Sequence, residues 1–167
     1  MRKVYWFLFF FSGFMQSLPA QDSRLYAFTN YTVKDGLASY NTQSVVQDEQ
    51  GYIWIGTING LQRFDGTRFI TFRHNPADPH ALPDNYIYQL HIDKEQHLWV
   101  LLNNGKIGIF DTRRFVFKEV KIRLKNQRHL TAIRSLLEDS GGNLFYVIQH
   151  EEILTFSKKN NEFAAVH

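Results

Sequence analysis

The chain has 167 residues, of which 44% are hydrophobic and 16% aromatic, and this is enough for one domain with a sizeable core. The formal net charge is only +3, and no groove-reading motif accompanies the scattered basic residues, so the sequence does not indicate binding to nucleic acid. The absence of cysteine excludes disulfides, thiolate metal ligands and cysteine nucleophiles.

Residues 1–20 are predicted to be a signal peptide. Arg2 and Lys3 give a short positive start, the stretch from Val4 to Met15 is almost continuously apolar, and the small residue Ala20 precedes the expected cleavage site. A membrane anchor is the alternative interpretation, but the apolar run is shorter than the roughly 20 residues that a spanning helix needs. The pattern therefore predicts export, to the periplasm in a bacterium with two membranes, and a mature chain at residues 21–167.

Strands joined by tight turns are predicted from residue 24 onward. After a strand at residues 24–33, four short strands are expected at residues 43–47, 52–57, 61–64 and 68–73. The turns between these four contain Asp48 with Gly51, Asn59-Gly60 and Asp65-Gly66, which are residues that tight turns favour. Four strands joined by three tight turns make one antiparallel sheet.

The same arrangement is expected twice more along the chain. The second set of strands is predicted at residues 88–92, 97–102, 106–110 and 115–121. The third set is predicted at residues 132–137, 143–149, 153–157 and 162–166. A longer link with three prolines, residues 74–85, separates the first two sets and is expected to be a surface loop.

The three sets are copies of one repeat. In each copy an aspartate is followed six positions later by an aromatic residue, and these structural pairs are Asp48 and Trp54, Asp93 and Trp99, and Asp139 and Phe145. The same apolar positions recur around each pair, for example Val45, Leu90 and Leu136, or Leu61, Ile107 and Ile153. The copies are 45 and 46 residues apart, a period that is typical of propeller blades.

The predicted fold class is all-β, an incomplete β-propeller of about three four-stranded antiparallel blades. The blades are expected at about residues 42–73, 87–121 and 132–166. Strand residues 52–55 are apolar on both faces, as expected for a blade that is covered by a neighbour on each side. The repeated aromatic residues are then expected to pack between blades. Even a four-bladed ring needs more chain than these three copies supply.

One stretch of the chain, residues 28–66, resembles a known family. The runs at residues 31–37, 44–48, 51–57 and 60–66, which read YTVKDGL, SVVQD, GYIWIGT and GLQRFDG, resemble the two-component regulator propeller repeat. That repeat builds the periplasmic sensors of hybrid two-component systems, the sensor histidine kinase/response regulators of Bacteroidetes. The second copy keeps Asp93, Trp99 and Phe110-Asp111, whereas the third lacks the tryptophan and the Gly-Leu pair.

The resemblance has several implications for this chain. It implies that the strand at residues 24–33 belongs to the last of seven blades and closes the ring. It also implies an oligosaccharide ligand and a parent receptor that signals through a membrane helix to a histidine kinase and phosphorelay. None of those signalling modules lies within the 167 residues, so the chain is interpreted as the start of a longer sensor, with the remaining blades and signalling domains as its partners and a homodimer as one further option. On its own such a fragment is expected to be poorly soluble or partly unfolded.

Candidate ligand-binding residues lie in the loops that enter each innermost strand and in those that join the second and third strands, because these loops share one propeller face. They are amide- and aromatic-bearing residues, as a carbohydrate contact would need: Tyr40, Asn41, Asn59, Asn85, Tyr86 and Asn104, with Asn103, His150 and Glu151 beside them. The alternative is ordinary turn chemistry, since asparagine before glycine is common in turns.

No catalytic residue, cofactor or metal is predicted. The aspartates Asp48, Asp93 and Asp139 are interpreted as turn residues, because paired acids for glycoside hydrolysis must lie about 5–10 Å apart. The histidines show no metal-ligand spacing. The favoured function is a glycan-sensing propeller fragment that is not itself an enzyme; a protein-interaction scaffold and, less favoured, a propeller glycosidase or lyase are the alternatives.

Overall fold

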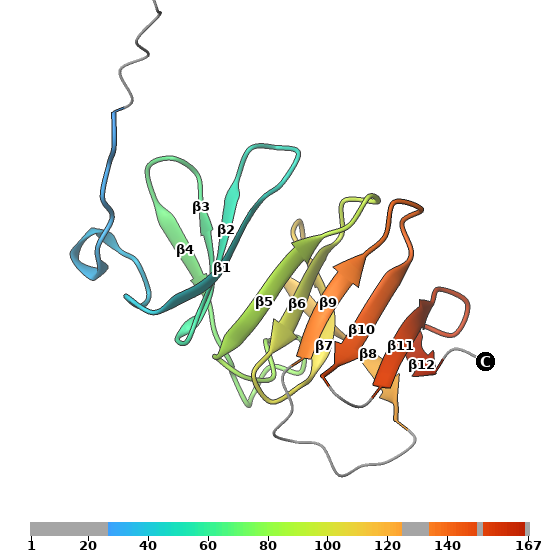
Figure 1. Cartoon of the computed structure of the whole chain (residues 1–167). Coiled ribbons are helices and arrows are strands. Elements are labelled where there is room, and N and C mark those ends of the chain that lie inside the picture. The colour runs from blue at the N-terminus through green and yellow to red at the C-terminus, as the bar shows by residue number, and fades with distance from the viewer. Residues whose placement is uncertain (1–26, 125–133, 150–151, 166–167) are drawn as a thin grey trace, which may run out of the picture. The chain divides into compact units, whose positions relative to one another are not determined.

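The computed structural model describes residues 27–124, 134–149 and 152–165 of the chain (Figure 1). The predicted signal peptide and two of the candidate ligand residues, His150 and Glu151, lie outside the described residues. The chain divides into residues 1–30 and residues 31–167, and all of the described strands belong to the second unit. No helix in the described ranges is long and apolar enough to cross a membrane.

Twelve strands and one short helix make up the described part of the second unit. The first sheet contains β1 (Thr42–Gln47), β2 (Ile53–Thr57), β3 (Gly60–Phe64) and β4 (Phe69–Phe72), and these four strands form blade 1. Blade 2 contains β5 (Ile87–Ile92), β6 (Leu98–Leu102), β7 (Ile107–Asp111) and β8 (Val116–Arg123). Blade 3 contains β9 (Arg134–Glu138), β10 (Leu144–Ile148), β11 (Glu152–Ser157) and β12 (Glu162–Ala165). Each blade is an antiparallel meander, so the all-β, propeller-like fold class is confirmed.

The predicted N-terminal strand is not a strand in the described residues. Residues 27–32 have no regular structure, and Val33–Asp35 forms a single 3-10 turn, η1. Thr32 caps this turn, since its Oγ1 accepts from the Lys34 amide at 3.2 Å while the Asp35 carboxylate accepts from the Thr32 amide at 2.7 Å. A strand needs a partner strand for its backbone groups, and this segment has none in the part of the chain that is described.

Blades 2 and 3 are joined at their outer edges, which the sequence did not predict. The eight residues of β8 are longer than β7, which pairs only with Val116 to Val120. The remaining residues Lys121 to Arg123 pair in parallel with β12, so the two blades form one eight-stranded sheet. The extra length of β8 therefore supplies backbone groups that only a neighbouring edge strand can satisfy.

Blade 2 is buried on both faces, as the apolar pattern of its strands predicts. In β6 the side chains of Leu98, Val100 and Leu102 lie in one core cluster with Trp54 and Leu61 of blade 1. The alternate residues Trp99 and Leu101 lie in a second cluster with Leu136, Leu144, Tyr146 and Leu154 of blade 3. Successive strand residues point to opposite faces, so one strand contributes to two cores. The repeated tryptophans of blades 1 and 2 each point toward the following blade.

Gly56 of blade 1 packs tightly against the side chain of Ile87 of blade 2. A Cβ at this position would lie 2.7 Å from Cγ2 of Ile87, which is itself fully buried. We therefore expect Gly56→Ala to lower the free energy of unfolding by about 1–3 kcal/mol, the usual cost of overpacking a core. Urea denaturation followed by tryptophan fluorescence measures this change.

A double-mutant cycle provides the control for this prediction. In an Ile87→Ala background the obstructing methyl groups are absent, so the same Gly56→Ala change should cost less. An equal cost in both backgrounds would contradict the proposed close approach.

Candidate functional site

The β1–β2 hairpin is closed by the carboxylate of Asp48. Its Oδ1 accepts hydrogen bonds from the backbone amides of Gln50 at 3.1 Å and Tyr52 at 2.9 Å. Its Oδ2 accepts from the indole Nε1 of Trp54 at 2.7 Å. The six-residue spacing from aspartate to tryptophan therefore has a direct physical cause, because the hairpin returns the indole N–H to the carboxylate.

The second copy of the hairpin has the same geometry. Oδ1 of Asp93 accepts from the amides of Glu95 at 2.9 Å and His97 at 2.8 Å, and Oδ2 accepts from Nε1 of Trp99 at 2.8 Å. Nδ1 of His97 lies 3.0 Å from the same Oδ2. The carboxylate is thus fully engaged within its own hairpin.

The third copy satisfies its aspartate without an indole. Oδ1 of Asp139 accepts from the amides of Gly141 and Asn143, both at 2.8 Å. Oδ2 accepts from the side-chain amide of Asn143, also at 2.8 Å. Phe145 has no donor to offer, and the residue four positions after the aspartate takes that role instead.

The hydrogen bonds of the second and third copies favour the charged form of Asp93 and Asp139. Burial would raise the pKa of Asp93, but the hydrogen bonds from Trp99 and His97 outweigh it and lower that pKa below 3.8. The side-chain amide of Asn143 is the largest of several causes that lower the pKa of Asp139. A carboxyl that stays ionised and is used by its own turn is poorly suited to donate a proton to a substrate.

Acid is expected to destabilise the protein through these and similar turns. The pKa of Asp65 is lowered to about 2, chiefly by the hydroxyl of Thr67, and the pKa of Asp111 is lowered by the amide of Arg114. Because the folded-state pKa values lie below the unfolded value near 3.8, their stabilisation is present above that pH and is lost as the pH falls through the folded values.

We therefore expect the melting temperature to fall steeply between about pH 4 and pH 2, as differential scanning calorimetry would measure. The Asp65→Asn variant should show a shallower fall over that interval, because one of the titrating groups is gone. An identical pH dependence of the two proteins would contradict this account.

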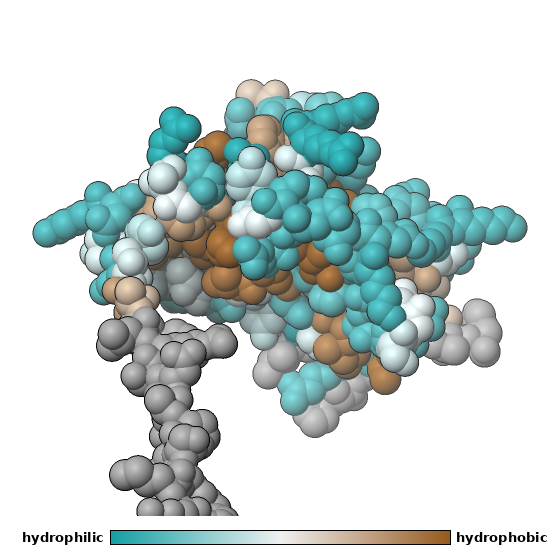
Figure 2. Space-filling view, turned by 90° about the horizontal axis from the view of Figure 1, so that it is seen from above, coloured by the Kyte–Doolittle hydropathy of each residue, from teal (hydrophilic) through white to brown (hydrophobic). Residues whose placement is uncertain are grey.

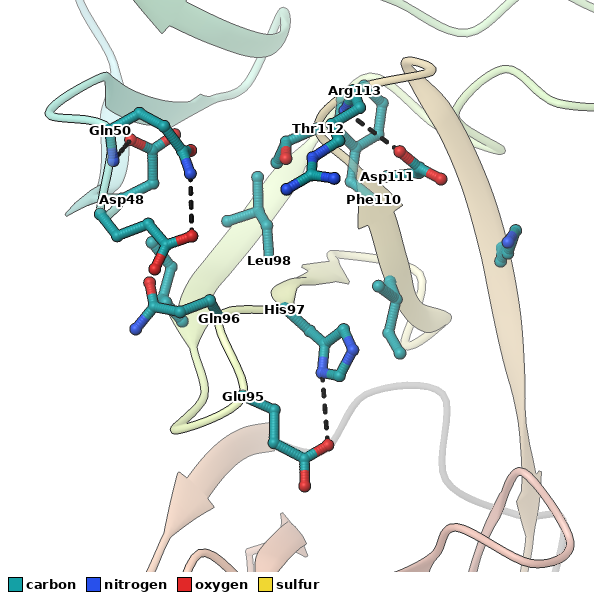
Figure 3. Close-up of a pocket in the computed structure, with 14 residues that line it drawn as sticks. Asp48, Gln50, Glu95, Gln96, His97, Leu98, Phe110, Asp111, Thr112 and Arg113 are labelled. Carbon is teal, nitrogen blue, oxygen red and sulfur yellow. Dashed lines mark hydrogen bonds and ion pairs between the residues drawn. The ribbon is translucent and has the colours of Figure 1, made fainter.

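Two hollows flank the β5–β6 hairpin at this end of the blades. The first, of about 480 Å³, lies between the β1–β2 hairpin and the β7–β8 turn, and Figure 3 shows Asp48 and Gln50 on one side of it with Thr112 and Arg113 on the other. The second, of about 460 Å³, lies between blades 2 and 3 beside Glu138 and Lys158. Acidic and basic side chains line both hollows, so neither is a patch of one sign that would select a charged ligand.

The loops predicted to carry ligand contacts lie at the opposite end of the sheets, where the β2–β3 and β6–β7 turns are found (Figure 1). Backbone hydrogen bonds bring these loops together. The carbonyl of Asn41 accepts from Ile58 at 3.3 Å, and that of Asn85 accepts from Gly60 at 2.8 Å. The carbonyl of Tyr86 accepts from Asn103 at 3.0 Å. Five of the predicted positions therefore belong to one connected set of loops, namely 41, 59, 85, 86 and 103.

In each of the asparagine side chains below, one of the two polar atoms of the amide makes a hydrogen bond within the protein. Nδ2 of Asn59 donates to the Ala38 carbonyl at 3.1 Å, Oδ1 of Asn85 accepts from the His74 amide at 2.8 Å, and Oδ1 of Asn104 accepts from the Lys106 amide at 3.0 Å. Oδ1 of Asn41 accepts from the side chain of Gln43. Within the described part of the chain, the other end of each of these amides makes no hydrogen bond. Tyr40 beside them is 73% exposed.

A family model described as two component regulator propeller matches residues 36–59. These residues run from the Asp-Gly turn after η1 through β1, the Asp48–Trp54 hairpin and β2. Residues 36–59 are therefore similar to a two component regulator propeller repeat. The matched residues lie in the first copy, which has the complete set of repeat residues.

The chain is similar in sequence to a curated kinase and in fold to two solved structures. Histidine kinase P4 of Formosa agariphila is 41% identical over 68 residues, which are 41% of this chain and 5% of that protein. The extracellular domain of a proposed hybrid two component system from B. thetaiotaomicron is similar with a TM-score of 0.68, at 19% identity over 83% of this chain and 20% of that chain. Virginiamycin B lyase from Staphylococcus aureus gives a TM-score of 0.55, at 16% identity over 74% of this chain and 40% of that chain. The two solved structures show the propeller fold, and the chain spans only a small part of each relative.

Polar clamps between the repeats were missed by the sequence analysis. Oε1 of Gln89 accepts from the Leu136 amide and its Nε2 donates to the Leu136 carbonyl, both at 2.9 Å, so the side chain acts as a short strand partner. Oγ of Ser44 bonds the Leu90 amide at 3.0 Å and lies 3.5 Å from the Leu90 carbonyl. Ser44 and Gln89 are 45 residues apart, one repeat length, and that spacing is the signal that could have revealed the clamps.

The side chains of Glu138 and Tyr146 also join blades 2 and 3. Glu138 accepts from the Lys94 amide at 3.1 Å and lies 2.9 Å from Nε2 of His91. The hydroxyl of Tyr146 donates to the Gly105 carbonyl at 3.0 Å, and burial raises the pKa of this tyrosine to about 12. Among the described residues no group of three or more histidine or acidic side chains could hold a metal ion.

Proposed function

We propose that this chain forms part of the ligand-sensing propeller of an exported two-component receptor, and that its ligand is an oligosaccharide. The repeat at residues 36–59 and the kinase relative support the receptor assignment. Export is supported by the charged and apolar pattern of residues 1–20 and by the structural relative from an extracellular domain. The kinase and phosphorelay modules of the parent receptor are part of the proposal.

The observation that favours an oligosaccharide is the group of side-chain amide atoms without a hydrogen-bond partner, within the described residues, on the loops around Asn59 and Asn85. An amide offers both donors and acceptors in one plane, and sugar hydroxyls require both. Tyr40 adds an exposed aromatic ring against which a sugar ring can pack. The carboxylates that a glycosidase or lyase would need are instead used within the hairpins at the other end of the blades, so the proposed role is binding without turnover.

The proposal is tested by isothermal titration of the purified chain against a panel of plant and host oligosaccharides. The variants should be Tyr40→Ala and Asn103→Ala, because neither side chain makes a hydrogen bond that the fold needs within the described ranges. Each substitution is expected to raise the dissociation constant about ten-fold. This is the equivalent of one lost hydrogen bond or stacking contact of roughly 1.4 kcal/mol.

Asn160→Ala is the matched control, since Asn160 lies in the β11–β12 turn at the other end of blade 3 and is exposed. It should leave the affinity unchanged. Binding that is equally strong in all of these variants would contradict the proposed face. Hydrolysis or elimination of any oligosaccharide by the purified chain would favour an enzyme, and specific binding of peptides without glycan binding would favour a scaffold.

A further inference from the structure

Arg63 is a charged residue inside the junction of blades 1 and 2. It pairs with Trp54 across β2 and β3, so its side chain lies on the face of blade 1 that packs on blade 2. The equivalent residues are Ile109 of blade 2 and Thr155 of blade 3, because each pairs with the repeated aromatic residue of its own blade. The fold of a blade therefore does not require a charge at this position.

Two aromatic rings lie against the guanidinium of Arg63. Its Cζ is 4.3 Å from the centroid of the Tyr52 ring and 5.2 Å from the centroid of the Phe115 ring. Such rings stabilise a positive charge, but they are poor hydrogen-bond acceptors. Nε is buried without an acceptor, and within the described ranges the guanidinium makes no hydrogen bond or ion pair. A buried donor without a partner is uncommon in proteins, and a site that binds an ion is one explanation for it.

The aspartates of the three neighbouring turns are engaged by other donors. Asp48 in the β1–β2 hairpin accepts from the indole of Trp54. Oδ1 of Asp65 in the β3–β4 turn accepts from the backbone amide two residues later at 2.8 Å. Oδ1 of Asp111 beside the β7–β8 turn accepts from the amide three residues later at 2.9 Å. Each of these carboxylates closes its own turn, so an added anion would meet the need of Arg63 for an acceptor.

Phe115 has a backbone conformation that large residues rarely adopt, with a φ of 60°. The equivalent position in the β11–β12 turn of blade 3 is Asn161, with a φ of 50°, and asparagine tolerates this region better. The side chain of Phe115 is also 40% exposed. Residues held in such conformations cluster at ligand clamps, where the strain is part of the mechanism. A movement of this turn would relieve the strain and uncover Arg63.

We propose that Arg63 binds an oxyanion, a carboxylate or a sulfate, at the junction of blades 1 and 2, and that the β7–β8 turn moves Phe115 aside to admit it. The N–H groups of a guanidinium lie in one plane and can bind two oxygens of one anion. The site lies at the end of the blades that Figure 2 shows from above, where apolar surface lies among hydrophilic side chains. The loops proposed to bind an oligosaccharide lie at the opposite end, so the two proposals stand independently.

Nuclear magnetic resonance of the purified chain tests the anion site directly. The Nε–H signal of Arg63 is followed while sodium sulfate or sodium acetate replaces sodium chloride at constant ionic strength. The expected result is a saturable shift of this signal, because Nε then donates a hydrogen bond to the anion. The two salts distinguish a tetrahedral anion from a planar carboxylate, and a saturable shift with either one supports the site. The absence of a saturable shift with both salts would overturn the proposal.

Three variants separate anion binding from the packing of the turn, with isothermal titration of the better-bound anion as the measurement. Arg63→Lys keeps the charge but not the planar donors, so it should raise the dissociation constant about ten-fold. Arg68→Lys makes the same change at an exposed arginine of blade 1 and should leave the constant unchanged. Phe115→Asn places the residue of blade 3 at the strained position and should lower the constant several-fold.

Circular dichroism establishes that each variant is folded before the titrations are compared. Equal affinity of the natural chain and Arg63→Lys would overturn the assignment of the site to Arg63. Weaker binding by Phe115→Asn than by the natural chain would overturn the role of Phe115 as a movable cover.

Discussion

Replacing Trp99 by alanine is expected to lower the free energy of unfolding by about 3–5 kcal/mol, the usual cost of removing a large aromatic side chain from a core. The side chain is 1% exposed and packs edge to face on Phe156 and Phe163, with ring centroids 4.9 and 5.8 Å apart. It also donates the indole hydrogen bond to Asp93. Domains of this size are stabilised by roughly 5–15 kcal/mol in total, so the expected loss is a large fraction of the stability of the protein. Urea denaturation monitored by circular dichroism measures the loss.

Two matched variants separate the hydrogen bond from the packing. Trp99→Phe keeps most of the ring but removes the N–H, and it should cost about 1.5–3 kcal/mol because the acceptor is charged. Combining it with His97→Asn rebuilds the third copy, in which Asn143 supplies the donor to Asp139 next to Phe145. The double variant should recover part of the loss. A double variant less stable than Trp99→Phe would show that the two hairpins are not equivalent.

Gln89→Leu is expected to have the second largest effect. The amide and carbonyl of Leu136 lie on the inner edge of blade 3, and Gln89 binds both of them. Leucine has a similar size but offers neither donor nor acceptor. Gln89 is only half-buried, so each backbone group left without a partner is expected to cost about 1–2 kcal/mol, and the loss for two groups is expected to be about 2–4 kcal/mol.

Hydrogen exchange gives this second prediction a local readout. The amide of Leu136 should exchange much faster in Gln89→Leu than in the natural chain, whereas the amide of Leu90, held by Ser44, should be little affected. Gln50→Leu makes the same chemical change in an exposed hairpin and serves as the control. Equal stability of the two variants would contradict a role for the clamp in joining blades 2 and 3.

The local elements were predictable because their causes are local. Asp48 with Gly51 specifies the β1–β2 turn, Asn59-Gly60 specifies the β2–β3 turn, and the apolar positions between them specify strands buried on both faces. Each such signal spans fewer than ten residues, and the repeat period then gives three blades. The six-residue step from aspartate to tryptophan was visible in the sequence, although the indole hydrogen bond that explains it was not.

The candidate ligand face was predictable only in part. Antiparallel strand order alone puts the β2–β3 and β6–β7 turns at one end, and this allowed Asn59 and Asn104 to be grouped. The sequence could not predict which polar atom of each side-chain amide lacks a hydrogen-bond partner. The partners Ala38 and His74 lie in loops, and no repeating sequence pattern predicts the path of those loops. The two hollows beside His97 were not predicted either, since they depend on the gap between neighbouring blades.

The repeat of three blades, the strand order within each blade and the hairpin that each aspartate closes could be predicted from the sequence, because those features depend on residues close together in the chain. Three features became visible only in the folded chain: β8 continues onto β12, residues 27–33 do not form the expected strand, and Ser44 and Gln89 bind the backbone of the next blade. The contacts of β8, Ser44 and Gln89 join groups that lie about one repeat apart in the chain. The strand expected at the N-terminus would need a partner strand. Every backbone N–H and C=O group in the core needs a hydrogen-bond partner, but the type of residue does not indicate which distant group will be that partner.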